Sequence, residues 1–330
     1  MRLLLGAFGD PGHAFPVIAL GRELTGRGHA VTLQTWERWR ADVEAEGMAF
    51  APAPEYHVFP TLQQPMKPYQ AVVRAVSSTR ELVAGVAPDA VVADILTLAP
   101  ALAGELEGVP VATVIPHVDP RFPPGFAPYS IGARLPRTAA GRAAWQRTDP
   151  LMRRGLELGR CELNETRRRL GLAALDRVHG GISEALCLVA TFPQLEYPRA
   201  WPARTHVTGP LLWEPPFGDV ELPPGDQPLV LVAPSTSQDP GHRLLRAALE
   251  GLAGMPVRVL ATYNRRMPDP PLDVPANARV VEWLSYSRTM AQCDLVVCHG
   301  GHGTVARALA SGCTIVAVPV AGDMNENAAR

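Results

Sequence analysis

Short apolar runs alternate with stretches of helical periodicity along the whole chain. Residues 3–8 are apolar or glycine throughout, which is typical of a strand buried on both faces. Apolar positions then recur at helical spacing between residues 17 and 24, and this helix is expected to end at Gly26 and Gly28. Residues 30–35 form the next strand-like run. The first unit is therefore predicted to be strand, helix, strand.

The same alternation continues toward the C-terminus. Further strands are expected at residues 90–93, 109–115, 186–192, 229–233, 257–262, 279–283, 295–298 and 314–318. Helices are expected around residues 244–252 and 304–311, and a highly charged helical stretch covers residues 145–171. We interpret the charged stretch as a solvent-exposed helix face with close-range ion pairs. Strands that alternate with helices predict parallel sheets and the α/β class.

A segment rich in proline and glycine separates two such series. Residues 209–216 and 223–225 cannot continue a helix or a central strand. We place a domain boundary there, between an N-terminal Rossmann-like domain (1–214) and a C-terminal one (215–330). The length of 330 residues and the 47% hydrophobic composition fit two domains with sizeable cores.

Composition narrows the class of protein and its partners. The formal net charge of −1 gives no indication of a nucleic-acid partner. The five cysteines are odd in number and form no CxxC pair, which favours reduced thiols in a cytoplasmic protein over disulfides or a zinc site. Residues 1–8 are too short for a signal-peptide core, and no apolar run approaches the roughly 20 residues of a membrane span. We therefore expect a cytoplasmic location without stable membrane insertion.

A glycine-rich turn near the C-terminus is the most informative motif. The apolar residues 295–298 lead into His299-Gly300-Gly301-His302-Gly303-Thr304 and then into a helix. Glycines let the backbone approach a ligand closely, and the helix start offers unpaired N–H groups with the positive end of a dipole. This combination binds diphosphates, although such a turn can also serve only to pack helix on strand. The two histidines favour the diphosphate site, because a packing turn does not need them.

Four blocks in the last third, in matching order and spacing, carry a family resemblance. They are residues 282–286 (EWLSY), 299–304 (HGGHGT), 310–312 (ASG) and 319–328 (PVAGDMNENA), and residues 12–16 (GHAFP) and 27–29 (RGH) match as well. The chain resembles the family-one glycosyltransferases, which include actinobacterial antibiotic- and macrolide-tailoring enzymes that use nucleotide sugars. The resemblance implies the GT-B fold, in which two Rossmann-like parallel-sheet domains face a central cleft and the C-terminal one binds the donor.

The resemblance also assigns roles in the donor site. By position, Trp283 adjoins the nucleobase, His299 contacts the diphosphate and Asp323 binds sugar hydroxyls. The other expected donor-binding residues are Ser235, Thr236, Gly301, Gly303 and Thr304. Two alternatives stay open: Trp283 as a core residue, and the Ser-Thr pair as a turn-forming pair.

Two positions depart from the family pattern. Members often have Glu eight residues after the loop histidine, where it binds the ribose hydroxyls, and Gln after the sugar-binding aspartate. This chain has Arg307 and Met324 at those positions. A nucleotide without a 2′-hydroxyl tolerates the loss of the ribose carboxylate, which hints at a dTDP-sugar donor.

The first strand–helix turn carries a candidate general base. His13 lies where side chains face the crevice at the carboxyl edge of the sheet, and imidazole titrates near the working pH. The resemblance places a catalytic histidine at this position. Asp94 is the expected orienting carboxylate, with Asp10 as its competitor and a helix cap as its alternative role. His117 and the loop 119–135 are expected to line the acceptor site.

These features predict an inverting hexosyltransferase of the EC 2.4.1 type. It would move a hexose or deoxyhexose from a UDP- or dTDP-sugar to a hydroxyl of a small, largely apolar acceptor such as a polyketide, macrolide or polyphenol. Metal and other cofactors are not expected, because no carboxylate cluster suits Mg²⁺. The alternatives are a lipid-linked N-acetylglucosaminyl transferase of cell-wall synthesis and a non-catalytic nucleotide-sugar-binding homologue.

Two expectations concern assembly and the chain end. A homodimer is left open. The sequence stops at Arg330 inside an expected helix that follows Asn325, and family members usually continue. The C-terminal domain is therefore expected to be incomplete.

Overall fold

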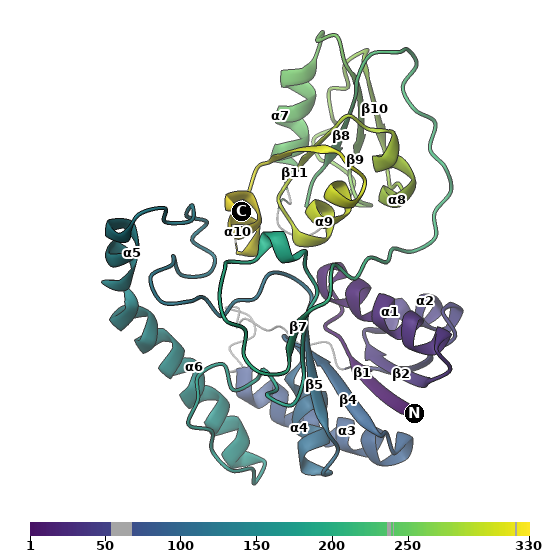
Figure 1. Cartoon of the computed structure of the whole chain (residues 1–330). Helices are drawn as coiled ribbons and strands as arrows, with labels where there is room; N and C mark the ends of the chain where they lie inside the picture. Colours follow the sequence, from purple (N-terminus) through teal and green to yellow (C-terminus); the bar gives the residue numbers. More distant parts are fainter. Residues whose placement is uncertain (54–67, 236–238, 240, 321) are drawn as a thin grey trace. The chain divides into compact units, whose positions relative to one another are not determined.

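The computed structural model describes residues 1–53, 68–235, 239, 241–320 and 322–330 (Figure 1). The chain forms two compact units. Unit 1 contains Met1–Phe126 and Pro136–Trp213, and unit 2 contains Ala127–Leu135 and Glu214–Arg330. The short segment Ala127–Leu135 thus leaves the unit of its sequence neighbours and packs within the other. None of the described helices is both long enough and apolar enough to cross a membrane.

Unit 1 is built on a parallel sheet with the strand order β3-β2-β1-β4-β5-β6-β7 in its described part. The strands are β1 (Arg2–Gly6), β2 (Ala30–Thr35), β3 (Ala49–Pro52), β4 (Ala90–Asp94), β5 (Val111–Ile115), β6 (Cys187–Val189) and β7 (Thr205–Val207). The helices are α1 (Pro11–Gly26), α2 (Arg40–Ala45), α3 (Pro68–Val86), α4 (Leu98–Leu106), α5 (Ala139–Gln146) and α6 (Asp149–Arg169), with 3-10 turns η1 (Glu37–Trp39) and η2 (Pro193–Leu195).

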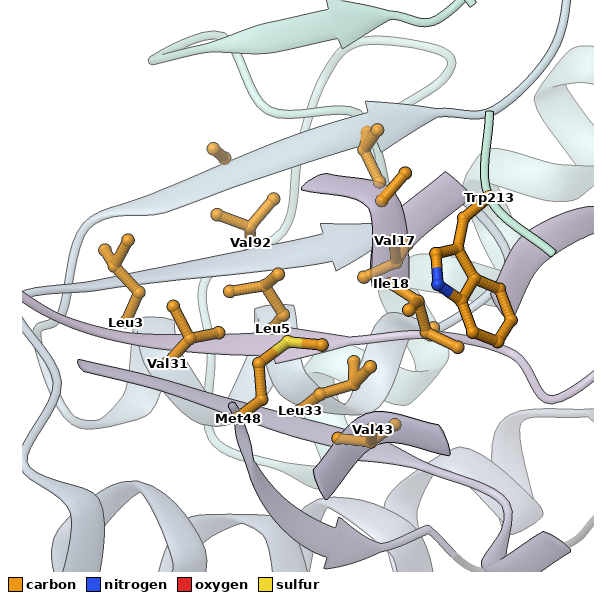
Figure 2. Packing of buried hydrophobic residues seen from close by; sticks show 14 residues of the cluster. Leu3, Leu5, Val17, Ile18, Val31, Leu33, Val43, Met48, Val92 and Trp213 are labelled. Carbon is orange, nitrogen blue, oxygen red and sulfur yellow. The ribbon is translucent and has the colours of Figure 1, made fainter. Parts of the chain in front are cut away.

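Alternate residues of β1 enter two different cores, because successive side chains of a strand point to opposite faces. Leu3 and Leu5 pack with residues of α1 and α2 on one face (Figure 2). Leu4 packs with residues of α3 and α4 on the other face. A strand covered on both faces must be apolar at every position, which explains the uninterrupted run at residues 3–8.

Unit 2 repeats this architecture with a smaller parallel sheet, ordered β10-β9-β8-β11-β12. The strands are β8 (Leu229–Ala233), β9 (Arg258–Thr262), β10 (Ala278–Val281), β11 (Leu295–Cys298) and β12 (Thr314–Ala317). The helices are α7 (Arg243–Leu252), α8 (Tyr286–Thr289), α9 (His302–Ala310) and α10 (Asp323–Ala329), with a 3-10 turn η3 (Met290–Gln292). Leu231 packs toward α9, and Val232 packs toward α7, so this sheet is also covered on both faces.

The observed strands agree with the predicted ones, with shifts of one to three residues at several ends. Two short strands, β3 and β7, and the helices α2 and α3 were not predicted. The charged stretch 145–171 is mainly the helix α6, and the short helix α5 ends at Gln146, just before it. Its ion pairs include Glu157–Arg160 and Glu165–Arg168 on exposed faces, as predicted. Arg167 differs, because its side chain is buried and pairs with Glu105.

The turn-rich segment is anchored at both sides of the boundary between the units. Trp213, the last residue of unit 1, is buried in the core shown in Figure 2, and its indole N–H donates to Glu46 at 2.6 Å. Glu214, the first residue of the following part of unit 2, accepts a 2.6 Å hydrogen bond from the Ser285 hydroxyl. The change of unit therefore falls between two adjacent residues that are held by different partners.

Candidate functional site

Each sheet has one point where the strand order reverses direction, and α/β sheets bind ligands in the crevice at that point. In unit 1 it lies between β1 and β4, and in unit 2 between β8 and β11. His13 follows β1 and Asp94 ends β4. Ser235 follows β8 and His299 follows β11. The residues expected in catalysis and in phosphate binding thus lie at the two switch points.

His13 and Asp94 form a close pair in unit 1. The His13 Nδ1 lies 2.8 Å from the Asp94 Oδ1, and the aspartate side chain is fully buried. The backbone N–H of Phe8 and the hydroxyl of Thr97 donate to the other carboxylate oxygen at 3.2 and 3.3 Å. A carboxylate accepts and does not donate, so the Nδ1 of His13 carries the proton and Nε2 carries the lone pair of the neutral ring.

The sequence left two alternatives to an orienting role of Asp94, namely Asp10 as the orienting carboxylate and Asp94 as a helix cap. The Asp10 carboxylate lies 3.7 Å from Arg38, and its backbone carbonyl accepts from His13 N, so Asp94 is the carboxylate that orients the imidazole. The N-cap residue of α4 is Thr97 rather than Asp94. Asp94 nevertheless shapes the turn before that helix, because its carbonyl accepts from Thr97 N at 2.8 Å.

His117 lies beside the pair formed by His13 and Asp94. Its ring centroid is 5.9 Å from that of His13 in an edge-on arrangement, and its Nδ1 donates to the Val118 carbonyl at 2.7 Å. The next residue but one, Asp119, is buried and pairs with Arg121 and Arg199. These ion pairs hold the loop after β5, in which His117 lies.

The glycine-rich turn of unit 2 connects β11 to α9. Burial lowers the pKa of His299 below its ordinary value, and its Nδ1 donates to the Ala233 carbonyl at 3.2 Å. Gly300 has φ +82, which favours glycine, and the carbonyl of Met324 lies close to it. Gly301 is the N-cap of α9. The turn is thereby pressed against the end of β8 on one side and the start of α10 on the other.

α9 begins at His302, two residues earlier than predicted, so Gly303 and Thr304 belong to its first turn. Gly303 is exposed, and a Cβ added there would meet nothing within 4 Å. His302 is buried instead, and its Nδ1 pairs with the Asn327 side-chain oxygen at 3.2 Å. It therefore belongs to the packing of α9 on α10 rather than to the exposed surface of the loop.

The remaining expected donor residues are distributed around this turn. Trp283 is half-buried, and the Arg265 guanidinium carbon lies 4.9 Å from its ring centroid. Asp323 begins α10, and Ser235 is buried just after β8. Thr236 lies outside the described residues. Among the described residues, no group of three or more His, Cys, Asp or Glu is placed to hold a metal ion.

Sequence reasoning missed Glu214. Its carboxylate accepts from the Ser285 hydroxyl and from the backbone N–H groups of Tyr286 and Ser287 at 2.6 to 3.1 Å, and it lies 3.7 Å from Arg307. Nothing in a proline-rich linker marks one glutamate as a partner of a distant helix. The departure from the family pattern at Arg307 was the available signal, because a cation at that position could be paired with a carboxylate from elsewhere in the chain.

Comparison with known proteins now identifies the family. The family model of the glycosyltransferase family 28 N-terminal domain matches residues 3–113, and that of the family 28 C-terminal domain matches residues 264–330. The chain belongs to glycosyltransferase family 28. The matched regions contain both switch-point turns, one with His13 and the other with His299.

Individual relatives agree with this assignment. A 4′-demethylrebeccamycin synthase of Lentzea aerocolonigenes is 28% identical over 366 aligned positions, which cover 100% of this chain and 85% of the relative. A PGL/p-HBAD biosynthesis glycosyltransferase of Mycobacterium tuberculosis is 30% identical over 76% of this chain. This match spans 59% of the mycobacterial relative's own length.

Solved structures confirm the predicted α/β class and the GT-B fold. The kitacinnamycin glycotransferase matches with a TM-score of 0.71 and 21% identity, over 99% of this chain and 82% of the other. The glycosyltransferase VinC, solved in complex with DTDP, matches with a TM-score of 0.61 and 19% identity, over 97% and 81% of the two chains.

Proposed function

We propose that this protein is an inverting glycosyltransferase, with an acceptor-binding unit 1 and a donor-binding unit 2. It transfers a hexose or deoxyhexose from a UDP- or dTDP-sugar to a hydroxyl of a small, largely apolar acceptor. The observation that carries the proposal is the His13–Asp94 pair at the switch point of unit 1, with a contact of 2.8 Å to a fully buried carboxylate. A buried carboxylate that orients a histidine is the arrangement of a general base.

In the proposed reaction, the Nε2 of His13 takes the proton of the acceptor hydroxyl. The oxygen forms a bond to the anomeric carbon as the bond from that carbon to the nucleotide diphosphate breaks, so the anomeric configuration inverts. The proton remains on His13, and Asp94 stabilises the imidazolium. His117, whose ring lies 5.9 Å from that of His13, would line the acceptor site.

The leaving diphosphate would lie at the start of α9. The N–H groups of the first helical turn and the helix dipole favour negative charge there, and the exposed Gly303 leaves room for a close approach. We assign His299, Gly301, Gly303, Thr304, Ser235 and Thr236 to the phosphates, Trp283 to the base and Asp323 to the sugar. The mechanism requires no metal, because backbone dipoles meet the developing charge.

Nucleotide binding can be tested by thermal shift. Nucleoside diphosphates are expected to raise the melting temperature by several degrees at about a hundredfold excess over Kd, because a ligand of the folded state stabilises by roughly 2.7 kcal/mol there. dTDP should stabilise more than UDP, because Arg307 stands where relatives often carry a ribose-binding carboxylate. A clear preference for UDP would contradict the dTDP-sugar donor, and the absence of any shift would contradict the donor site.

The affinity for nucleoside diphosphate is expected to rise several-fold as the pH falls from about 8 to about 6. The Nδ1–H of His299 is donated to Ala233, so the Nε2 of the neutral ring is an acceptor and needs a second proton to contact a phosphate oxygen. Burial lowers the pKa of His299 from its ordinary 6.5 in the free protein, and a bound phosphate raises it. At a pH between the pKa of His299 in the free protein and its pKa in the complex, binding therefore takes up a proton. The contribution of this proton to the affinity is lost at higher pH.

Isothermal titration in two buffers of different ionisation enthalpy measures this proton uptake. The His299→Gln variant is the control, since any titration of the nucleotide itself persists in it. An identical pH dependence in both proteins would refute the assignment of His299 to the phosphates.

A further inference from the structure

Arg307 is a nearly buried cation whose hydrogen-bonding capacity is unused. Its side chain is 12% exposed, and its closest ionic partner among the described residues is Glu214, at 3.7 Å from Nε. A guanidinium carries five N–H donors, yet none of them makes a hydrogen bond within the described part of the chain. None of its nitrogens is among the fully buried unpartnered atoms of the described residues, so they keep some exposure and the acceptor that they lack can come from outside the chain.

Glu214 does not accept a hydrogen bond from this guanidinium, because its closest oxygen, Oε2, lies 3.7 Å from the Nε of Arg307. Its carboxylate accepts from the hydroxyls of Ser285 and Ser287 and from the N–H groups of Tyr286 and Ser287, at 2.5 to 3.1 Å. Three of these donors reach Oε1, and only the N–H of Tyr286 reaches Oε2, so the start of α8 fixes the carboxylate in place. Glu214 thus caps α8 and acts on Arg307 as a fixed counter-charge rather than as a hydrogen-bond partner.

The position of Arg307 on α9 indicates where the missing acceptor lies. Long side chains of a helix lean toward its N-terminus and cover the preceding turn. Gly303 is four residues before Arg307 and occupies that turn on the same face. Because Gly303 has no side chain and open space around it, the guanidinium can reach a ligand held at the start of the helix.

We infer that Arg307 binds the phosphate oxygens of the nucleotide diphosphate and that Glu214 is the residue that positions its guanidinium. The inference rests on the proposed donor site. It adds the Arg307 guanidinium to that site, although no sequence motif marks this residue as a ligand of the diphosphate. Burial lowers the pKa of Arg307, but an arginine stays charged at neutral pH. An anion at this place would offset the cost of burying the cation. Guanidinium also suits phosphate oxygens because its donors lie in a planar fork.

The test compares thymidine, dTMP and dTDP as ligands of the full chain by isothermal titration. Arg307→Met is expected to weaken dTDP binding roughly tenfold to thirtyfold while thymidine affinity stays unchanged, and Arg307→Lys should restore part of the loss. Arg279→Met is the matched control, because Arg279 pairs with Glu221 on the exposed surface of the same unit. Equal losses for thymidine and dTDP, or no loss for either, would overturn the inference.

The role of Glu214 is tested by a double-mutant cycle. Glu214→Gln keeps an oxygen to accept from the start of α8 but removes the counter-charge, so dTDP affinity should fall several-fold while thymidine affinity stays unchanged. In the Arg307→Met background the same change should cost nearly nothing, because Glu214 acts through Arg307. Additive losses would show a purely structural role and refute the positioning.

Failure of this inference is distinguishable from failure of the proposed function. If the unmodified protein binds dTDP and Arg307→Met binds it equally well, only the inference is overturned. If the unmodified protein binds no nucleoside diphosphate at all, the donor site and the inference are overturned together.

Discussion

Replacing His13 with alanine is expected to lower kcat/KM about 10³-fold, within the range that general-base catalysis supplies. The variant lacks the imidazole nitrogen that takes the acceptor proton. The Asp94 carboxylate is then left without an imidazole to orient. Nucleotide affinity should be unchanged, since the donor residues belong to unit 2 and His13 belongs to unit 1. The loss should therefore appear in turnover and not in binding.

Steady-state kinetics with a panel of nucleotide sugars and hydroxylated acceptors, beside nucleotide titration of both proteins, provides the measurement. His206→Ala is the control, because His206 is an exposed histidine of the same unit in the short strand β7. Retained turnover in His13→Ala would exclude this residue as the base. If the unmodified protein binds nucleotide but never turns over any acceptor, the non-catalytic homologue is the correct interpretation.

The strands that carry the candidate residues followed from the sequence, whereas the strand order that makes two switch points came from the structure. Uninterrupted apolar runs such as residues 3–8 and 229–233 are required by strands covered on both faces, so their positions were predicted to within a few residues. Polar residues that directly follow or end such runs must lie at the carboxyl edge of a parallel sheet. His13, Asp94 and His299 could be placed in this way without any structure.

Features that depend on contacts between distant segments could not be predicted from the sequence. The strands β3 and β7 have four and three residues, too few for a periodic pattern to stand out. The choice between Asp94 and Asp10 depended on the side chain of Arg38, which comes from a separate element and pairs with Asp10. The transfer of Ala127–Leu135 to unit 2 includes a hydrogen bond from Gly132 N to the fully buried Glu326, nearly two hundred residues away.

Glu214 and Arg307 show the same limit at the candidate site itself. Sequence alone marked Arg307 as a departure and gave no counterpart for it, because Glu214 lies in a linker more than ninety positions upstream. Only the structure shows the pair, because the backbone at the start of α8 binds the Glu214 carboxylate and holds it near Arg307 of α9. Site residues that a motif carries are local in sequence, whereas residues that position them often are not.

Replacing Gly301 with alanine is expected to weaken nucleoside diphosphate binding about 100-fold with little change in melting temperature. Gly301 has φ −61 and ψ 138, which alanine adopts without strain, so the effect is steric. An added Cβ would lie 2.2 Å from the Nε2 of His299. The imidazole must then rotate, which breaks its hydrogen bond to Ala233 and moves it away from the start of α9.

A double-mutant cycle separates this clash from a general disturbance of the turn. In a His299→Ala background the obstacle is gone, so Gly301→Ala should cost little more, and the two losses should be far from additive. Gly251→Ala in α7 is the matched control, because its Cβ meets nothing within 4 Å and alanine favours a helix interior. If Gly301→Ala binds dTDP as tightly as the unmodified protein, then His299 does not contact the diphosphate. The donor would then have to bind away from the start of α9.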